Sequence, residues 1–152
     1  MSAPAWHWRN ELLWWYALCA LFAAACFLAS GWSGVAFFVA QAFVGIALLE
    51  VVNYDEHYGL ARKQLADGRY EPVSVMHSWD SCSLLTNLYL FQLQRHPDHH
   101  RYSRRPYQIL RHTSEAPQLP AGYSVMILLA LVPPLWFAIM NPRAEAARHA
   151  RD

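Results

Sequence analysis

The sequence predicts an all-α integral membrane protein: a helical hairpin through the membrane, joined to a mostly helical, histidine-rich cytoplasmic cap. Three observations favour this fold class. Hydrophobic residues make up 55% of the 152 residues and charged residues only 15%, against roughly 25% charged in a soluble domain. Two long runs near the N-terminus are almost free of charge, and most of the charged residues follow them. Most of the eight histidines lie in that same later segment.

The two apolar runs are the expected transmembrane helices. Residues 12–29 carry no charge, and residues 35–52 are interrupted only by Gln41 and Glu50. Each run is close to the roughly 20 residues that cross a bilayer core as a helix. The turn between them, residues 30–34, is short and uncharged, which predicts a hairpin. The first run is too long for a signal peptide and has no clean small-residue cleavage site at its end.

The rest of the chain is expected to complete one domain. Residues 53–121 form the polar cytoplasmic section, in which Ser83–Gln94 is the best helix candidate. Residues 123–140 are a third apolar stretch, broken by Pro133 and Pro134. We expect an interfacial or capping helix there, because this arrangement leaves all the basic residues on one side of the membrane. A third membrane span is the alternative.

Charge and cysteine content limit the partners and cofactors. The net charge of +1 gives no excess for binding a polyanion, so we expect no nucleic-acid partner. The three cysteines, Cys19, Cys26 and Cys82, form no C-x-x-C pair. A rubredoxin-like or zinc-ribbon site within this chain is therefore not expected.

The most informative motif is a run of histidines at His96, His99 and His100. On a helix these positions share one face, so the three imidazoles could converge on one or two transition-metal ions. Pro97 suits the first turn of such a helix, and Asp98 could hold a ring N–H of a ligand. The alternative is a solvated polar loop beside the neighbouring arginines.

A second motif begins where the second apolar run ends. His57 lies about one turn beyond that run, next to Asp55 and Glu56, and Glu50 lies within the run itself. Ionisable groups at this depth suggest function, although an interfacial cap explains them too. His77 and His112 are isolated in the sequence, and each is more often a structural residue than a metal ligand.

These segments resemble the integral-membrane alkane 1-monooxygenase family, within the membrane fatty acid desaturase and hydroxylase superfamily. Residues 53–60 (NYDEHYGL) look like its N-Y-x-E-H-Y-G-L signature, and residues 93–100 (LQRHPDHH) look like its L-Q-R-H-x-D-H-H box. Residues 110–112 and 115–123 are similar to the tail after that box. Residues 77–79 (HSW) also match, although Asp80 stands where Asn is usual. The resemblance runs from about Trp8 to Arg143.

The resemblance implies a non-haem di-iron enzyme of the bacterial inner membrane, multi-pass, with its metal site on the cytoplasmic side. It makes His57, His96, His99 and His100 the iron ligands, and Glu56, Asp98, His77 and His112 supporting or structural residues. It implies that electrons come from rubredoxin, and that O₂ and a medium-chain alkane give the primary alcohol. Arg101, Arg104 and Arg105 could dock the electron donor, or could simply follow the positive-inside rule.

Two earlier histidine boxes of that family, H-E-x-x-H-K and E-H-x-x-G-H-H, do not occur in this sequence. We therefore expect the C-terminal portion of such an enzyme: a fragment, a truncated gene product, or one half of a split enzyme with a complementary N-terminal half. Alone it should not hold two irons or turn over. The alternatives are a related di-iron hydroxylase or desaturase that acts on acyl or xylene-type substrates, and a non-catalytic membrane remnant.

Overall fold

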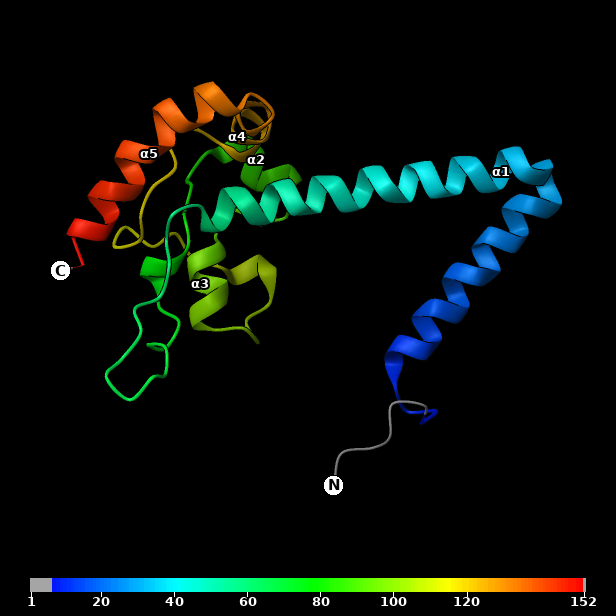
Figure 1. Ribbon diagram of the computed structural model, residues 1–152, viewed down its shortest axis with the longest axis horizontal. Coiled ribbons are helices and arrows are strands. Elements are labelled where there is room, and N and C mark those ends of the chain that lie inside the picture. Colours follow the sequence, from blue (N-terminus) through cyan, green and yellow to red (C-terminus); the bar gives the residue numbers. More distant parts are fainter. Residues whose placement is uncertain (1–6, 152) are drawn as a thin grey trace. The chain divides into compact units, whose positions relative to one another are not determined.

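The computed structural model describes residues 7–151 and divides into two compact units, Met1–Leu48 and Leu49–Asp152. The regular elements of the described residues are helices, which confirms the all-α class, with two isolated β-bridges at Gln64–Tyr70 and Asp80–Gln118 (Figure 1). The elements in chain order are α1 (Glu11–His57), η1 (Val75–His77), α2 (Leu84–Tyr89), α3 (His96–Arg101), η2 (Tyr107–Ile109), α4 (Tyr123–Ala130) and α5 (Pro133–His149).

The first unit consists mainly of the apolar part of α1. Within residues 7–151, α1 is the one helix long and apolar enough to cross a membrane, and only 6% of its most apolar window is buried. Its helical geometry breaks at Gly31, where φ is 61° and ψ is −148°. The expected five-residue turn is therefore a kink at one glycine, a residue that adopts positive φ without a steric penalty.

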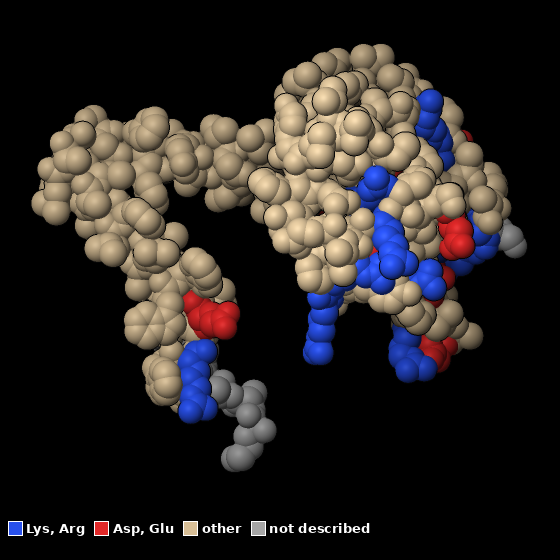
Figure 2. Space-filling model, turned by 180° about the vertical axis from the view of Figure 1, so that it is seen from behind, with Lys and Arg blue, Asp and Glu red and all other residues tan. Residues whose placement is uncertain are grey.

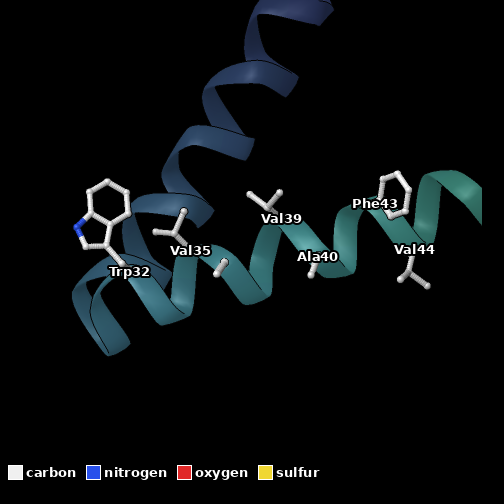
Figure 3. A pocket seen from close by; sticks show the side chains of 7 residues that line it. Trp32, Val35, Val39, Ala40, Phe43 and Val44 are labelled. Carbon is white, nitrogen blue, oxygen red and sulfur yellow. The ribbon is translucent and has the colours of Figure 1, made fainter.

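Most side chains of α1 in the first unit are apolar and exposed. Trp32, Val39 and Phe43 are among the residues that line a shallow apolar groove along α1 (Figure 3). No Lys, Arg, Asp or Glu occurs between Glu11 and Glu50, and the middle of α1 carries neither blue nor red atoms in Figure 2. This surface suits an apolar solvent rather than water.

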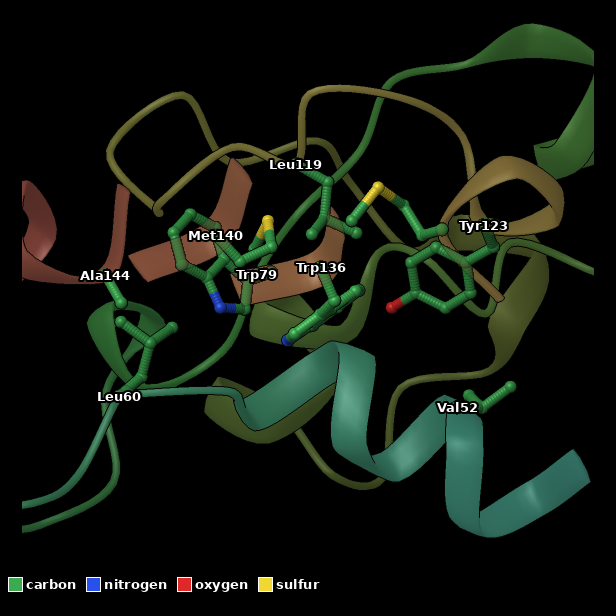
Figure 4. Close-up of a cluster of buried hydrophobic side chains, with 9 residues drawn as sticks. Val52, Leu60, Trp79, Leu119, Tyr123, Trp136, Met140 and Ala144 are labelled. Carbon is green, nitrogen blue, oxygen red and sulfur yellow. The ribbon is translucent and has the colours of Figure 1, made fainter. Parts of the chain in front are cut away.

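The second unit has its own hydrophobic core, assembled from the last turns of α1, from α4 and α5, and from the loops between them. Trp79, Trp136 and Tyr123 are its largest members (Figure 4). The remaining buried members are Val52, Leu60, Leu119, Met126, Met140 and Ala144. This core places the polar end of α1 against segments that lie more than 60 residues further along the chain.

Gly59 ends α1 and allows this packing. Its φ is +72°, and a Cβ at this position would lie 2.6 Å from the Cβ of Ala144 in α5. The position therefore requires both a left-handed backbone and the absence of a side chain. The chain can then leave the helix two residues after His57.

Two helix predictions need correction. The predicted helix Ser83–Gln94 is only α2, Leu84–Tyr89, because the chain then turns through Phe91 and Gln92, whose φ values are 50° and 60°. The stretch 123–140 forms two helices rather than one. The prolines do interrupt it, but they occupy the first turn of α5, which continues to His149.

Candidate metal centre

Three histidine side chains meet where the end of α1 lies beside α3. The ligand nitrogens of His57, His96 and His100 all lie within 4.8 Å of one another. The Nε2 atoms of His57 and His96 are 3.2 Å apart, and the ring centroids of His96 and His100 are 4.4 Å apart. The 3.2 Å pair already has the spacing of neighbouring ligands on one transition-metal ion, since metal–nitrogen bonds of about 2 Å leave neighbouring ligands roughly 3 Å apart.

The local sequence explains how α3 presents its two rings. Pro97 occupies the first turn of α3, where its missing N–H has no partner to lose. His96 and His100 are four residues apart, so both rings project from one face of this short helix. His57 is the last residue of α1 and completes the group from the other side.

Polar contacts of the remaining ring nitrogens orient two of these rings. The Nδ1 of His57 lies 3.1 Å from the carbonyl oxygen of His77, which can only accept, so His57 donates through Nδ1 and its Nε2 lone pair faces the cluster. The Nδ1 of His96 lies 3.2 Å from Oε1 of Glu56, a carboxyl group that is only 2% exposed. Such contacts are typical of metal-bound histidines.

The third ring supports the same interpretation. The Nε2 of His100 is buried and has no hydrogen-bond partner among the described residues. A buried, unpaired polar atom costs free energy unless a ligand or ion satisfies it. The three side chains thus each direct a nitrogen to the cluster, and the donor set fits a cation that prefers imidazole.

Burial keeps these imidazoles in the form that binds metals. It lowers the pKa of His96 to about 3, with smaller contributions from the neighbouring rings of His100, His57 and His99. Burial likewise lowers the pKa of His100. Both rings are therefore neutral at pH 7, and no proton has to be removed before they ligate.

His99, the remaining histidine of the motif, lies outside this group. Its ring centroid is 5.8 Å from that of His96 and 6.0 Å from that of His100. It instead lines a recess together with His96 and five apolar or aromatic side chains: Leu90, Phe91, Leu93, Tyr107 and Leu110. A ligand in this recess would contact apolar groups and two imidazoles at once.

Asp98 holds neither ring of the cluster, contrary to the role suggested by its position. Its carboxylate accepts from Nη1 of Arg105 at 2.6 and 2.7 Å and from the backbone N–H of Arg111 at 3.0 Å. It therefore ties α3 to the loop that follows. Arg105 is committed to this contact and to the ring of Tyr102, whereas Arg101 and Arg104 are exposed.

His77 and His112 make structural contacts outside the cluster. The Nδ1 of His77 accepts from the backbone N–H of Ser74 at 2.9 Å, so its Nε2–H donates to Glu71 at 2.9 Å. Arg151, at the end of the described chain, also contacts Glu71. His112 donates through Nδ1 to the buried carboxylate of Asp80 at 2.7 Å. His77 still supports the cluster through its backbone carbonyl group.

Sequence reasoning missed Tyr123. Its hydroxyl group donates to Oε1 of Glu56 at 3.1 Å, and the residue is fully buried. The partners are 67 positions apart, and an aromatic residue at the start of an apolar stretch gives no sign of a polar contact. Its place in the tail motif of residues 115–123 was the one available signal.

Comparison with known proteins assigns the chain to a family. The family model for fatty acid desaturases matches residues 2–130. The chain belongs to the fatty acid desaturase family. This family is membrane-associated and iron-dependent, which agrees with the apolar α1 and with the three-histidine cluster.

Similar proteins bear the name alkane 1-monooxygenase. The chain is 59% identical over 143 residues to alkane 1-monooxygenase 2 of Pseudomonas aeruginosa, which covers 94% of this chain and 38% of that protein. It is 60% identical over 138 residues to alkane 1-monooxygenase 2 of Alcanivorax borkumensis, covering 91% of this chain and 36% of that protein. The hydroxylase component of a xylene/toluene monooxygenase of Pseudomonas putida is 31% identical over 102 residues, 67% of this chain and 26% of that protein.

The chain thus spans a little over a third of the length of the first two relatives. The identity to these two relatives is about twice the 31% identity to the xylene/toluene enzyme.

Proposed function

We propose that this chain carries the C-terminal part of an iron-dependent, membrane-bound alkane hydroxylase, and that His57, His96 and His100 hold one iron of its centre. The observation that carries the proposal is the convergence of three imidazole nitrogens within 4.8 Å. Polar contacts orient the rings of His57 and His96, and the buried Nε2 of His100 has no partner among the described residues. His99 would serve the second iron of a di-iron pair, with further ligands from residues outside this chain. The bound metal would supply the activation of O₂ and the oxidation of a C–H bond.

The roles of this chain's own residues follow from their contacts. Glu56 and the His77 carbonyl group hold the rings of His96 and His57 so that Nε2 of each faces the cluster. The recess beside His96 and His99 offers an apolar wall to the terminal methyl group of a medium-chain alkane. An apolar substrate gains free energy by leaving water for such a wall, at about 0.8 kcal/mol for each buried CH₂ group.

The α1 helix is the proposed membrane anchor. A straight helix of 47 residues would extend about 70 Å, more than twice the roughly 30 Å core of a bilayer. The kink at Gly31 divides it into two segments that match the spans 12–29 and 35–52. Both ends would then lie on the cytoplasmic side of a bacterial inner membrane, with the histidine cluster just beyond the lipid.

Rubredoxin is the proposed electron donor, and the exposed side chains Arg101 and Arg104 are the proposed docking contacts. Arg105 is a weaker candidate because Asp98 holds its guanidinium. Attraction between an acidic donor and exposed arginines should weaken as salt is added.

The test is a hybrid enzyme. We would replace the matching 143-residue segment of the Pseudomonas aeruginosa relative by this chain, and supply rubredoxin, its reductase, NADH and octane. The expected product is 1-octanol, formed by the hybrid and not by the same hybrid with His57→Ala. His112→Ala is the matched control, because it removes a histidine that contacts Asp80 and not the cluster.

Two other outcomes would assign different functions. A hybrid that binds iron and oxidises xylene or an acyl chain but not octane would place the chain in another branch of the superfamily. A folded hybrid without iron would show that the chain is a non-catalytic remnant. Either result would overturn the alkane assignment.

A further inference from the structure

The buried phenol of Tyr123 lies one hydrogen bond and one close nitrogen–oxygen contact away from the histidine cluster. Its hydroxyl oxygen is 3.1 Å from Oε1 of Glu56, and the same Oε1 is 3.2 Å from Nδ1 of His96. The opposite nitrogen of His96, Nε2, faces His57 across 3.2 Å. Together these contacts form a continuous series from the core of the second unit to the histidine cluster.

We propose that Tyr123 is a positioning residue of the metal centre: it fixes the carboxyl group of Glu56, which in turn orients the ring of His96. The inference rests on the proposed function, since it concerns the same cluster. When His96 ligates a cation through Nε2, its Nδ1 carries the proton and donates to Glu56. Tyr123 donates to the same carboxylate from the other side, which holds the oxygen where the ring needs it.

The surroundings hold this series of contacts, from Tyr123 through Glu56 to His96, in place. Tyr123 and Glu56 are 0% and 2% exposed, so water does not compete for the contacts of this carboxyl group. Burial raises the pKa of Tyr123, so the phenol stays protonated and can donate to Glu56. In Figure 4 its hydroxyl oxygen points toward α1, the helix that carries Glu56.

The backbone before Tyr123 is fixed as well. Gly122 precedes α4, and a Cβ at this glycine would lie 2.7 Å from both Oγ of Ser83 and Oγ1 of Thr86. The start of α4 is therefore pressed against α2 without space for a side chain. The hydroxyl group of Ser81 also donates to the carbonyl oxygen of Ala121 at 3.3 Å. These contacts leave Tyr123 little freedom to move away from Glu56.

The alternative is a Tyr123 that only fills the core, and the two roles predict different results. We would titrate the full chain, in detergent or nanodiscs, with Co²⁺ and record the affinity and the visible ligand-field spectrum. Tyr123→Phe keeps the ring and removes one oxygen, and Glu56→Gln keeps the shape and an acceptor oxygen. We expect Glu56→Gln to weaken Co²⁺ binding by about 10- to 100-fold, and Tyr123→Phe by a smaller factor of roughly 3 to 10.

The double variant is decisive, because a residue that acts through Glu56 loses its effect when Glu56 is changed. We expect Tyr123→Phe combined with Glu56→Gln to bind Co²⁺ about as weakly as Glu56→Gln alone. Each positioning variant should also shift the ligand-field bands, which a loss of core packing would leave in place. Tyr58→Phe is the matched control: it removes a hydroxyl group that donates to Asn141, and Co²⁺ binding should not change.

The outcomes separate this inference from the proposed function. If the unaltered chain binds no Co²⁺ at the histidines, the proposed function fails, and this inference fails with it. If the unaltered chain binds Co²⁺ and Tyr123→Phe has the same affinity and spectrum, only this inference is overturned. Additive losses in the double variant with unshifted bands would assign Tyr123 to the core alone.

Discussion

The two units of the chain differ in the side chains that they expose and bury. In Met1–Leu48 large apolar groups are exposed, with Trp14 at 64% and Trp32 at 78%. In Leu49–Asp152 the most buried residues include carboxyl groups, with Asp55 and Asp80 both at 0%. The first unit is suited to lipid, and the second places polarity in its interior. Hydropathy is therefore a good guide to the first unit and a poor guide to the chemistry of the second.

The buried carboxyl groups of the second unit differ in their polar partners. Asp80 and Asp98 are hydrogen-bonded within their own loops, and Glu56 contacts the cluster. Both carboxyl oxygens of Asp55 lack a partner among the described residues. Buried polarity is costly unless it is paired, so the second unit gives up stability to organise a site.

The largest expected difference between the units is the cost of deleting a tryptophan. Trp136→Ala removes a fully buried core side chain and should lower the free energy of unfolding by about 3–5 kcal/mol. Trp32→Ala removes an exposed one and should change it by no more than about 0.5 kcal/mol. Urea unfolding in detergent, followed by near-UV circular dichroism, measures both. Equal costs would remove the contrast between the units.

The next effect concerns buried polarity. Asp80→Ala leaves the backbone N–H groups of Ser81 and Thr113 and the ring of His112 without their acceptor, and should cost about 3 kcal/mol. Asp80→Asn keeps one acceptor oxygen and should cost about 1 kcal/mol. The same unfolding measurement applies. A neutral Asp80→Ala would show that this carboxylate does not organise the second unit.

A smaller effect separates two glycines of the second unit. Gly59 and Gly68 both have positive φ, but only Gly59 faces a neighbour, the Cβ of Ala144 at 2.6 Å. Gly68→Ala should cost about 1 kcal/mol for the backbone alone. Gly59→Ala should cost about 1–3 kcal/mol more, because the added methyl group must displace α5. If both variants lose the same stability, the close approach of α5 to the end of α1 is wrong.

The smallest effect is a dependence on pH that only the second unit should show. The pKa of His96 is lowered to about 3, so below its ordinary value of 6.5 the unfolded chain takes up a proton that the folded chain does not. His96 therefore destabilises the folded chain progressively as the pH falls from 6.5 towards 3. Burial raises the pKa of Asp55 to about 7 and that of Glu56 to about 8, so these two carboxyl groups act in the opposite sense, and the His96 effect has to be isolated by a variant. Between pH 7 and pH 6 this contribution of His96 should cost about 0.7 kcal/mol. The measurement is the stability of the metal-free unaltered chain minus that of His96→Gln at each pH. This difference should fall on acidification, and a difference that stays constant would contradict the prediction.

Local pattern was enough for the fold class and for most of the cluster. The spacing of His96 and His100 correctly predicted two side chains that the structure brings together, whereas only the family resemblance joined His57 to them. Local pattern could not decide that His99, one residue from His100, would point into a recess instead, because that depends on the rotation of a short helix against α1. Local pattern could not predict the contacts of Asp98 with Arg105 and of Glu56 with Tyr123 either, because these contacts depend on how separate segments pack together.

The central claim is that imidazoles of His57, His96 and His100 bind one cation through nitrogens that already face each other. X-ray absorption spectroscopy of the full chain, loaded with one equivalent of Fe²⁺, counts imidazole ligands directly. The account predicts back-scattering from about three imidazole rings at about 2.1 Å, falling to two rings in His57→Ala. A coordination shell of oxygen atoms alone, or a shell that His57→Ala leaves unchanged, would contradict it.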